Sequence, residues 1–184
     1  MILTDREIRI AIQRRLIVLD PAPRPDAYSS TSVDLTLDRS ARMFRREVAA
    51  GRRIDPAARG FRFSEAVDEL TEPVAIRPRF SLRRGGALLL LAWTREKLEL
   101  PTTARLAARV EGKSSLARLG IGVHITAPTI HAGFKGQLQL EIVNHGPADV
   151  VLRPGMPICQ LIFEQTLGTP EKGYAGIFAG QSSH

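Results

Sequence analysis

The hydrophobic pattern of the chain begins with a helix. Thr4 and Glu7 have the spacing of a capping box, in which each side chain accepts the backbone N–H of the other residue at a helix start. Apolar residues then recur at helical spacing, at Ile8, Ile12 and Leu16. We expect a helix over about residues 5–15. The proline-rich run 20–25 that follows is incompatible with regular structure.

Most of the remaining pattern is typical of short β-strands separated by turns. The expected strands cover residues 32–37, 74–80, 87–93, 104–111, 121–126, 136–144, 149–152 and 157–164. Turns are indicated by the glycine and proline runs at 84–86, 145–147 and 153–155. The charged stretch 45–73 interrupts this series and is expected to be an irregular surface excursion.

This order of elements predicts a mainly β protein, a sandwich or jelly-roll-like barrel with a short N-terminal helix and small helical additions. The length of 184 residues fits one domain, and no repeat divides it. We therefore expect residues 1–184 to form a single domain. The glycine- and serine-containing segment from about residue 168 is expected to be a mobile C-terminal tail.

Composition narrows the possible partners. The longest apolar run, 87–93, is too short to span a bilayer, and no signal peptide is evident, so we expect a cytoplasmic location and no membrane partner. The net charge of +7 favours small polyanions. Nucleic acid is not the expected partner, because the arginines are scattered and few aromatic residues lie among them.

The sequence offers no signature of a metal site. Cys159 is the single cysteine and lies in an apolar run, which predicts a buried structural thiol. One cysteine cannot supply the paired-cysteine zinc motif of the common base deaminases, so any deamination here would proceed without that metal. His124 and His131 lack the neighbours of a zinc-binding motif and are expected to be packed or turn histidines.

The run Gly112-Lys113-Ser114-Ser115-Leu116-Ala117-Arg118-Leu119-Gly120 is the clearest candidate for anion binding. It places two hydroxyls, a lysine and an arginine around an expected helix start, where free N–H groups attract phosphate. Ser114 and Arg118 lie four residues apart and share one face of such a helix. A P-loop is excluded, because Ala107 stands where that motif needs glycine. A capped surface turn remains the alternative reading.

The expected strand 136–144 carries the candidate acid–base residue. Leu138, Leu140 and Ile142 face one way, while Gln137, Gln139 and Glu141 share the other face. Glu141 is either an ordinary solvent-facing carboxylate or, if this polar face lines a pocket, a group suited to proton transfer. The spacing alone does not decide between them.

Several motifs, in order along the chain, resemble those of dCTP deaminases in the dUTPase superfamily. They are the opening residues 1–8, Ser32-Val33-Asp34-Leu35, the run 112–120, His124-Ile125-Thr126-Ala127, residues 132–136, and Arg153-Pro154-Gly155-Met156 continuing to Gln160-Leu161. The resemblance implies a dUTPase-like distorted jelly-roll barrel, a homotrimer with active sites between subunits, and zinc-independent hydrolysis of dCTP to dUTP and ammonia. The dUTP would feed dUMP and dTTP synthesis.

The same resemblance implies roles for individual residues. Glu141 would be the general base and acid, with Ser114 and Arg118 positioning the attacking water and stabilising developing charge. The implied substrate-binding residues are Lys113, Ser115 and Gln181 at the triphosphate, which normally carries Mg²⁺, Gln139 at the base, and Ala127, His131 and Tyr174 around the substrate.

Two departures from the family pattern keep alternatives open. His131 stands where the family usually has an aspartate that contacts the sugar, and the chain printed here stops soon after Gln181. A dUTP pyrophosphatase, or a bifunctional deaminase–pyrophosphatase forming dUMP, is the first alternative. The second is a catalytically silent nucleotide-binding regulator.

Overall fold

The computed structural model describes residues 1–86, 88–174, 176 and 180–183. The helical segments are α1 (Asp5–Gln13), η1 (Pro25–Ala27), α2 (Arg46–Ala49), α3 (Phe63–Leu70), η2 (Thr102–Ala104) and α4 (Ser114–Ala117). The strands are β1 (Val18–Asp20), β2 (Tyr28–Ser29), β3 (Ser32–Phe44), β4 (Thr71–Ala75), β5 (Phe80–Leu82), β6 (Leu89–Glu99), β7 (Leu106–Gly112), β8 (Ile121–Gly122), β9 (Thr129–Ile130), β10 (Lys135–Asn144), β11 (Val150–Leu152) and β12 (Pro157–Gln165). The expectation of a mainly β protein is confirmed.

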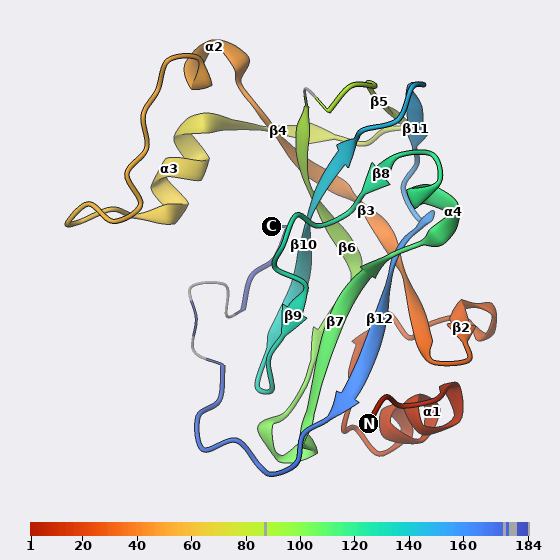
Figure 1. Ribbon diagram of the computed structural model, residues 1–184. Coiled ribbons are helices and arrows are strands. Elements are labelled where there is room, and N and C mark those ends of the chain that lie inside the picture. Colours follow the sequence, from red (N-terminus) through yellow and green to blue (C-terminus); the bar gives the residue numbers. More distant parts are fainter. Residues whose placement is uncertain (87, 175, 177–179, 184) are drawn as a thin grey trace.

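Among the described residues, ten strands form one curled sheet and β5 pairs with β11 in a separate ribbon (Figure 1). The main path through the sheet is β8-β10-β6-β3-β12-β7-β9, with β1 beside β6 and with β2 and β4 beside β3. Strand β3 belongs to both halves of the sheet. Its first part pairs with β12 through residues 33–36, and its later part pairs with β6 through residues 41–43.

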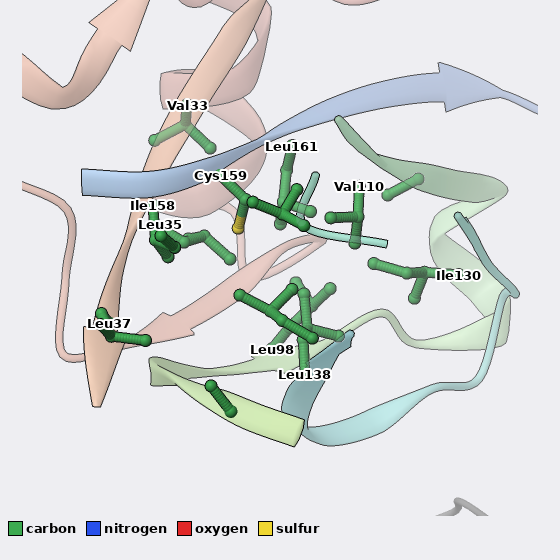
Figure 2. Packing of buried hydrophobic residues seen from close by; sticks show 14 of the residues in the cluster. Val33, Leu35, Leu37, Leu98, Val110, Ile130, Leu138, Ile158, Cys159 and Leu161 are labelled. Carbon is green, nitrogen blue, oxygen red and sulfur yellow. The ribbon is translucent and has the colours of Figure 1, made fainter. Parts of the chain in front are cut away.

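The core fills the space that the curled sheet encloses. On β3, Val33, Leu35 and Leu37 are fully buried and alternate with polar residues, as a strand with one buried face requires. Leu161 of β12 and Leu138 of β10 point into the same interior from strands far apart in the sequence (Figure 2). Burying these side chains is the main favourable term that holds the sheet closed.

Cys159 is fully buried within this core, which confirms the sequence prediction of a buried thiol. Burial raises the pKa of the thiol, and the nearby carboxylates of Glu96 and Asp34 raise it further. The thiol is therefore neutral at physiological pH and lacks the thiolate form that reacts.

We expect the folded protein to resist alkylation of Cys159 by iodoacetamide at pH 8, because the neutral thiol is also closed off from reagent. Mass spectrometry after labelling measures this. Unfolding in guanidinium should expose the thiol and give full modification. Complete labelling of the folded protein on the same time scale would show that the core opens readily.

Several expected boundaries differ from the structure for identifiable reasons. The expected irregular stretch 45–73 was wrong in part, since it contains α2 and α3 and the start of β4. In α3, Ala66, Val67 and Leu70 are the less exposed positions and have helical spacing that the many charged residues obscured. The expected helix 5–15 ends at Gln13, with Arg15 in a left-handed conformation just beyond it.

Several strand expectations also needed correction: β3, expected at 32–37, continues to Phe44, and the strand expected at 74–80 is divided between the end of β4 and the start of β5. The strand expected at 87–93 runs from Leu89 to Glu99, because Thr94, Glu96 and Leu98 continue its buried face. The carboxylate of Glu96 is accommodated there by hydrogen bonds from the backbone N–H and the hydroxyl of Thr36, at 2.8 and 2.7 Å. The strand expected at 121–126 ends at Gly122, and a loop follows it.

Candidate active site

Glu141 lies on the outer face of the sheet, opposite the core. Its neighbours Leu140 and Ile142 are buried in the core, whereas Gln139 and Glu141 are half-buried on the other face. Oε2 of Glu141 accepts a hydrogen bond from the backbone N–H of Ile125 at 3.3 Å. The carboxylate is thus sheltered by the loop after β8 and keeps further lone pairs for a water molecule.

The side chains beside Glu141 on the outer face are apolar and largely buried. Leu91 of β6 pairs directly with Glu141, and Trp93 pairs with Gln139. Directly opposed residues of neighbouring strands point to the same side of a sheet, so these four side chains share the outer face. A carboxylate and an amide next to an indole and a leucine can receive a small planar ring bearing polar substituents.

The loop 123–128 crosses the edge of this surface. It begins at β8, which pairs with the end of β10, and its last carbonyl, of Pro128, accepts the backbone N–H of Val110 at 2.9 Å. Ala127 is exposed in this loop, close in sequence to the Ile125 N–H that binds Glu141. The expected role of Ala127 beside the carboxylate stays a prediction.

The second group of candidate residues lies in the turn 112–120, which we call the Ser-Arg turn. Ser114, Ser115 and Arg118 are exposed, and the backbone N–H of Arg118 donates to the Ser114 carbonyl at 3.1 Å. The expected helix therefore forms and places Ser114 and Arg118 on one face. Because α4 is a single turn, its dipole is small, and the arginine charge is the main attraction for an anion.

Lys113, at the start of the Ser-Arg turn, is already paired. Its ammonium forms an ion pair with Asp34 of β3, with 23% and 15% of the two side chains exposed. Gln160 of β12 holds the same segment, since its amide donates to the Gly112 carbonyl at 3.0 Å and accepts from the Ser32 hydroxyl at 2.7 Å. Asp34 and Gln160 were not among the candidate site residues, yet they fix where the turn begins.

Two glycines fix where the Ser-Arg turn ends. A Cβ on Gly146 would lie 2.0 Å from the Leu119 carbonyl oxygen, and one on Gly120 would lie 2.2 Å from the Gly146 backbone nitrogen. The backbone N–H of His145 also donates to the Gly120 carbonyl at 2.8 Å. The turn can therefore lie against the end of β10 only while positions 120 and 146 lack side chains.

The C-terminal segment packs along the start of β10 (Figure 1). The backbone N–H of Gln137 donates to the Gln181 carbonyl at 3.0 Å, and the Gln181 side-chain amide donates to the Gln137 carbonyl at 2.9 Å. Gly136 makes this approach possible, because a Cβ there would lie 2.7 Å from the Gln181 carbonyl oxygen. Gln181 therefore lies beside Gln137, which is two residues before Gln139 on β10. The mobility expected for this segment stays a prediction.

Tyr174 is held beside the turn that precedes β10. Its backbone N–H donates to the Ala132 carbonyl at 3.1 Å, and a Cβ on Gly133 would lie 2.7 Å from its nitrogen. The ring of Tyr174 stacks on the exposed ring of His131, with centroids 5.8 Å apart, and is tilted against Phe134 at the same distance. His131 and Tyr174 therefore lie together at the turn before β10, where Tyr174 also packs against the core. His124 is half-buried in the loop after β8.

One chain therefore presents two separate groups of candidate residues. Gln139 and Glu141 lie on β10, with Gln181 beside its start and His131 and Tyr174 at the turn before it, whereas Lys113, Ser114, Ser115 and Arg118 lie on the Ser-Arg turn. Across the described residues, no hydrogen bond or ion pair joins Glu141 to the side chains of the turn. Nor do three or more His, Cys, Asp or Glu side chains cluster as metal ligands anywhere in the described ranges.

Comparison with known proteins identifies relatives of this chain. The model of the dCTP deaminase-like family matches residues 2–166. A dCTP deaminase of Rhodospirillum rubrum is 36% identical over 177 residues, which cover 95% of this chain and 88% of that protein. A protein of Bifidobacterium adolescentis named dCTP deaminase, dUMP-forming, is 38% identical over 182 residues, or 98% of this chain and 87% of that protein.

A solved structure has the same fold. The crystal structure of the 2′-deoxycytidine 5′-triphosphate deaminase from Agrobacterium tumefaciens matches with a TM-score of 0.68 and 24% identity, over 89% of this chain. The present chain spans about half of that longer one, 48% of its length. At this identity the match supports the fold alone. Since the family model covers most of the sequence and relatives align along nearly all of it, the protein belongs to the dCTP deaminase-like family.

Proposed function

We propose that the protein hydrolyses dCTP to dUTP and ammonia. The observation that carries the proposal is the half-buried carboxylate of Glu141 beside the half-buried amide of Gln139 on the outer face of the sheet. Family membership and relatives named dCTP deaminase support the choice of substrate. The loop N–H on Oε2 orients the carboxylate while leaving it able to take and give a proton.

In this proposal Glu141 acts twice on the same substrate. It accepts a proton from water as the water oxygen bonds to C4 of cytosine, and it then delivers a proton to the departing amino group. The products are the 4-oxo pyrimidine and ammonia, so one water is consumed and the carboxylate returns to its starting state. Charge that develops at the ring would be stabilised by a guanidinium and hydroxyl, which we assign to Arg118 and Ser114.

A second subunit would complete the site. Because no hydrogen bond or ion pair joins Glu141 to the side chains of the Ser-Arg turn among the described residues, we assign the two groups to opposite sides of a subunit interface in a homotrimer. In the single chain Ser114, Ser115 and Arg118 are exposed, as residues that wait for a partner subunit would be.

We also propose that the protein is cytoplasmic and has no nucleic-acid or membrane partner. The described part of the chain contains no helix long and apolar enough to cross a membrane.

The triphosphate would lie between the Ser-Arg turn and Gln181. Ser115 and the free N–H groups at the start of α4 are suited to phosphate oxygens. Lys113 contributes positive charge, but its main role is to hold the turn in place through its ion pair with Asp34. Mg²⁺ would arrive bound to the phosphates and neutralise part of their charge. Zinc independence is also part of the proposal, supported by a sequence whose only cysteine is sealed in the core.

The product is the point on which the alternatives differ. The dUMP-forming relative from Bifidobacterium adolescentis favours keeping a bifunctional deaminase–pyrophosphatase as the second candidate. By the family resemblance, an aspartate that helps to activate water at the α-phosphate would stand where this chain has His131, and its replacement favours a deaminase that stops at dUTP. Incubation with dCTP and Mg²⁺, with ammonia and pyrophosphate both quantified, separates these outcomes. Ammonia alone supports the proposal, pyrophosphate as well indicates dUMP formation, and nucleotide binding without ammonia indicates a regulator.

We expect His131→Ala to reduce discrimination between dCTP and CTP. The imidazole stacks on Tyr174 at the turn before β10 and can hydrogen-bond a sugar hydroxyl. Its loss should raise the KM for dCTP several-fold and leave the KM for CTP nearly unchanged. Steady-state kinetics with both nucleotides measures this. His145→Ala, in the exposed turn after β10, is the matched control, and equal effects of the two changes on the KM ratio would remove His131 from sugar recognition.

A further inference from the structure

A cavity of about 510 Å³ opens on the outer face of the sheet, beside the candidate active site. It is lined by strands β3, β4 and β6 and by the end of the C-terminal segment, and its polar lining includes Arg39, Arg42, Arg77, Ser182 and Ser183. Its volume falls in the range of small-molecule sites, roughly 300–1,000 Å³. None of the residues assigned to catalysis lines it.

Strand pairing places this cavity next to the proposed substrate surface. Trp93 lines the cavity and pairs with Gln139, and Arg42 pairs with Leu91, the residue opposite Glu141. The tail contributes Ser183, whose backbone N–H donates to the Gln137 side chain at 2.7 Å. The cavity therefore shares β6 and the C-terminal segment with the candidate active site.

The charge of the cavity is strongly positive and largely uncompensated. Arg42 is occupied, since it pairs with Asp68 at 2.8 Å and its Nε donates to the Thr71 hydroxyl at 2.7 Å. Arg39 and Arg77 form no ion pair or side-chain hydrogen bond within the described ranges, and both are exposed. The lining includes no aspartate or glutamate. Two guanidinium groups without partners around one cavity are suited to bind an anion with several oxygens.

We propose that this cavity is a polyphosphate-binding site, which takes the phosphate chain of a nucleotide or free pyrophosphate. Arg39 and Arg77 bind the phosphate oxygens, while Arg42 is held in the wall by Asp68 and Thr71. Because Ser182 and Ser183 also line the cavity, an anion there contacts the segment that carries Gln181 and favours its packing on β10. The site goes beyond the proposed deamination, which does not require it.

The test is a calorimetric titration of the full chain with inorganic pyrophosphate at fixed ionic strength, without nucleotide. Arg39→Gln with Arg77→Gln should weaken pyrophosphate binding by about tenfold or more, since each lost guanidinium removes charge-assisted hydrogen bonds. The matched control is Arg14→Gln with Arg15→Gln, which removes the same charge from exposed positions after α1 and should leave the affinity within about twofold. Arg118→Ala should leave binding in the cavity intact.

The source of the phosphate chain is decided by repeating the titration with Glu141→Gln and saturating dCTP, so that substrate is not consumed. If dCTP abolishes the part of pyrophosphate binding that depends on Arg39 and Arg77, the cavity takes the phosphates of a nucleotide; if dCTP leaves that part unchanged, the cavity takes free polyphosphate. Equal affinity of wild type and the Arg39/Arg77 double variant overturns the proposal, as does a changed oligomeric mass with unchanged affinity. Ammonia release from dCTP, assayed separately, tests the deaminase proposal without reference to the cavity.

Discussion

Replacing Glu141 with glutamine should abolish release of ammonia from dCTP while leaving nucleotide binding nearly unchanged. The amide has almost the same shape and still offers an oxygen to the Ile125 N–H, so the loop after β8 keeps its contact. It cannot take a proton from water or return one to the leaving group. General acid–base groups typically supply about 10²–10⁴-fold in rate, and Glu141 performs both transfers, so we expect a loss at the upper end of this range.

The measurements are ammonia release for turnover and calorimetry for dCTP binding. Glu99→Gln is the matched control, because Glu99 is a half-buried carboxylate on the adjacent strand β6, where it pairs with Lys135 at 3.0 Å. That variant should turn over dCTP at close to the wild-type rate. Substantial turnover by Glu141→Gln would remove Glu141 from the proton transfers, and loss of binding together with turnover would indicate a structural role.

Replacing Arg118 with alanine should slow turnover by about 10²–10³-fold, equivalent to about 3–4 kcal/mol of transition-state stabilisation. The side chain is exposed and makes no ion pair within the described residues, so the free energy of unfolding should change little. Arg59→Ala, at an exposed position in the loop before α3, controls for the loss of one positive charge. Circular dichroism melting and ammonia release, measured on the same samples, distinguish a catalytic effect from a folding effect.

A mixing experiment sharpens this second prediction. If Glu141 and Arg118 of one site come from different subunits, exchanged mixtures of the Glu141→Gln and Arg118→Ala proteins contain some sites with both native residues. Random assembly from equal amounts would make about a quarter of the sites intact. Recovery of activity well above that of either variant is the expected result. No recovery after demonstrated subunit exchange would place both residues of a site in one chain.

Local pattern was enough to predict the parts of the fold that local forces determine. The capping box at Thr4 and Glu7 forms as expected, and the alternation from Leu138 to Ile142 correctly separates the core face from the face that bears Glu141. The Ser-Arg turn also folds as a short helix at the expected place. In each case the signal and the contact that produces it lie within a few residues of each other.

The features that escaped prediction depend on contacts between distant segments. Burial of Glu96 within β6 requires the two hydrogen bonds from Thr36, which lies 60 residues earlier. The ion pair of Asp34 with Lys113 also joins distant segments, and no local pattern around either residue indicates it. The tail residue Gln181 likewise acquires its neighbours only where Gly136 leaves room. The roles of the candidate residues toward substrate stay predictions.

Because β3 belongs to both halves of the sheet, the two halves should unfold together. Its first part supports the half of the sheet that anchors Lys113, and its later part supports the half that carries Glu141. Loss of either half would leave one edge of β3 without hydrogen-bond partners and would open the shared interior to water. Thermal melting should therefore be all-or-none, without a partly folded form that retains one group of site residues and not the other.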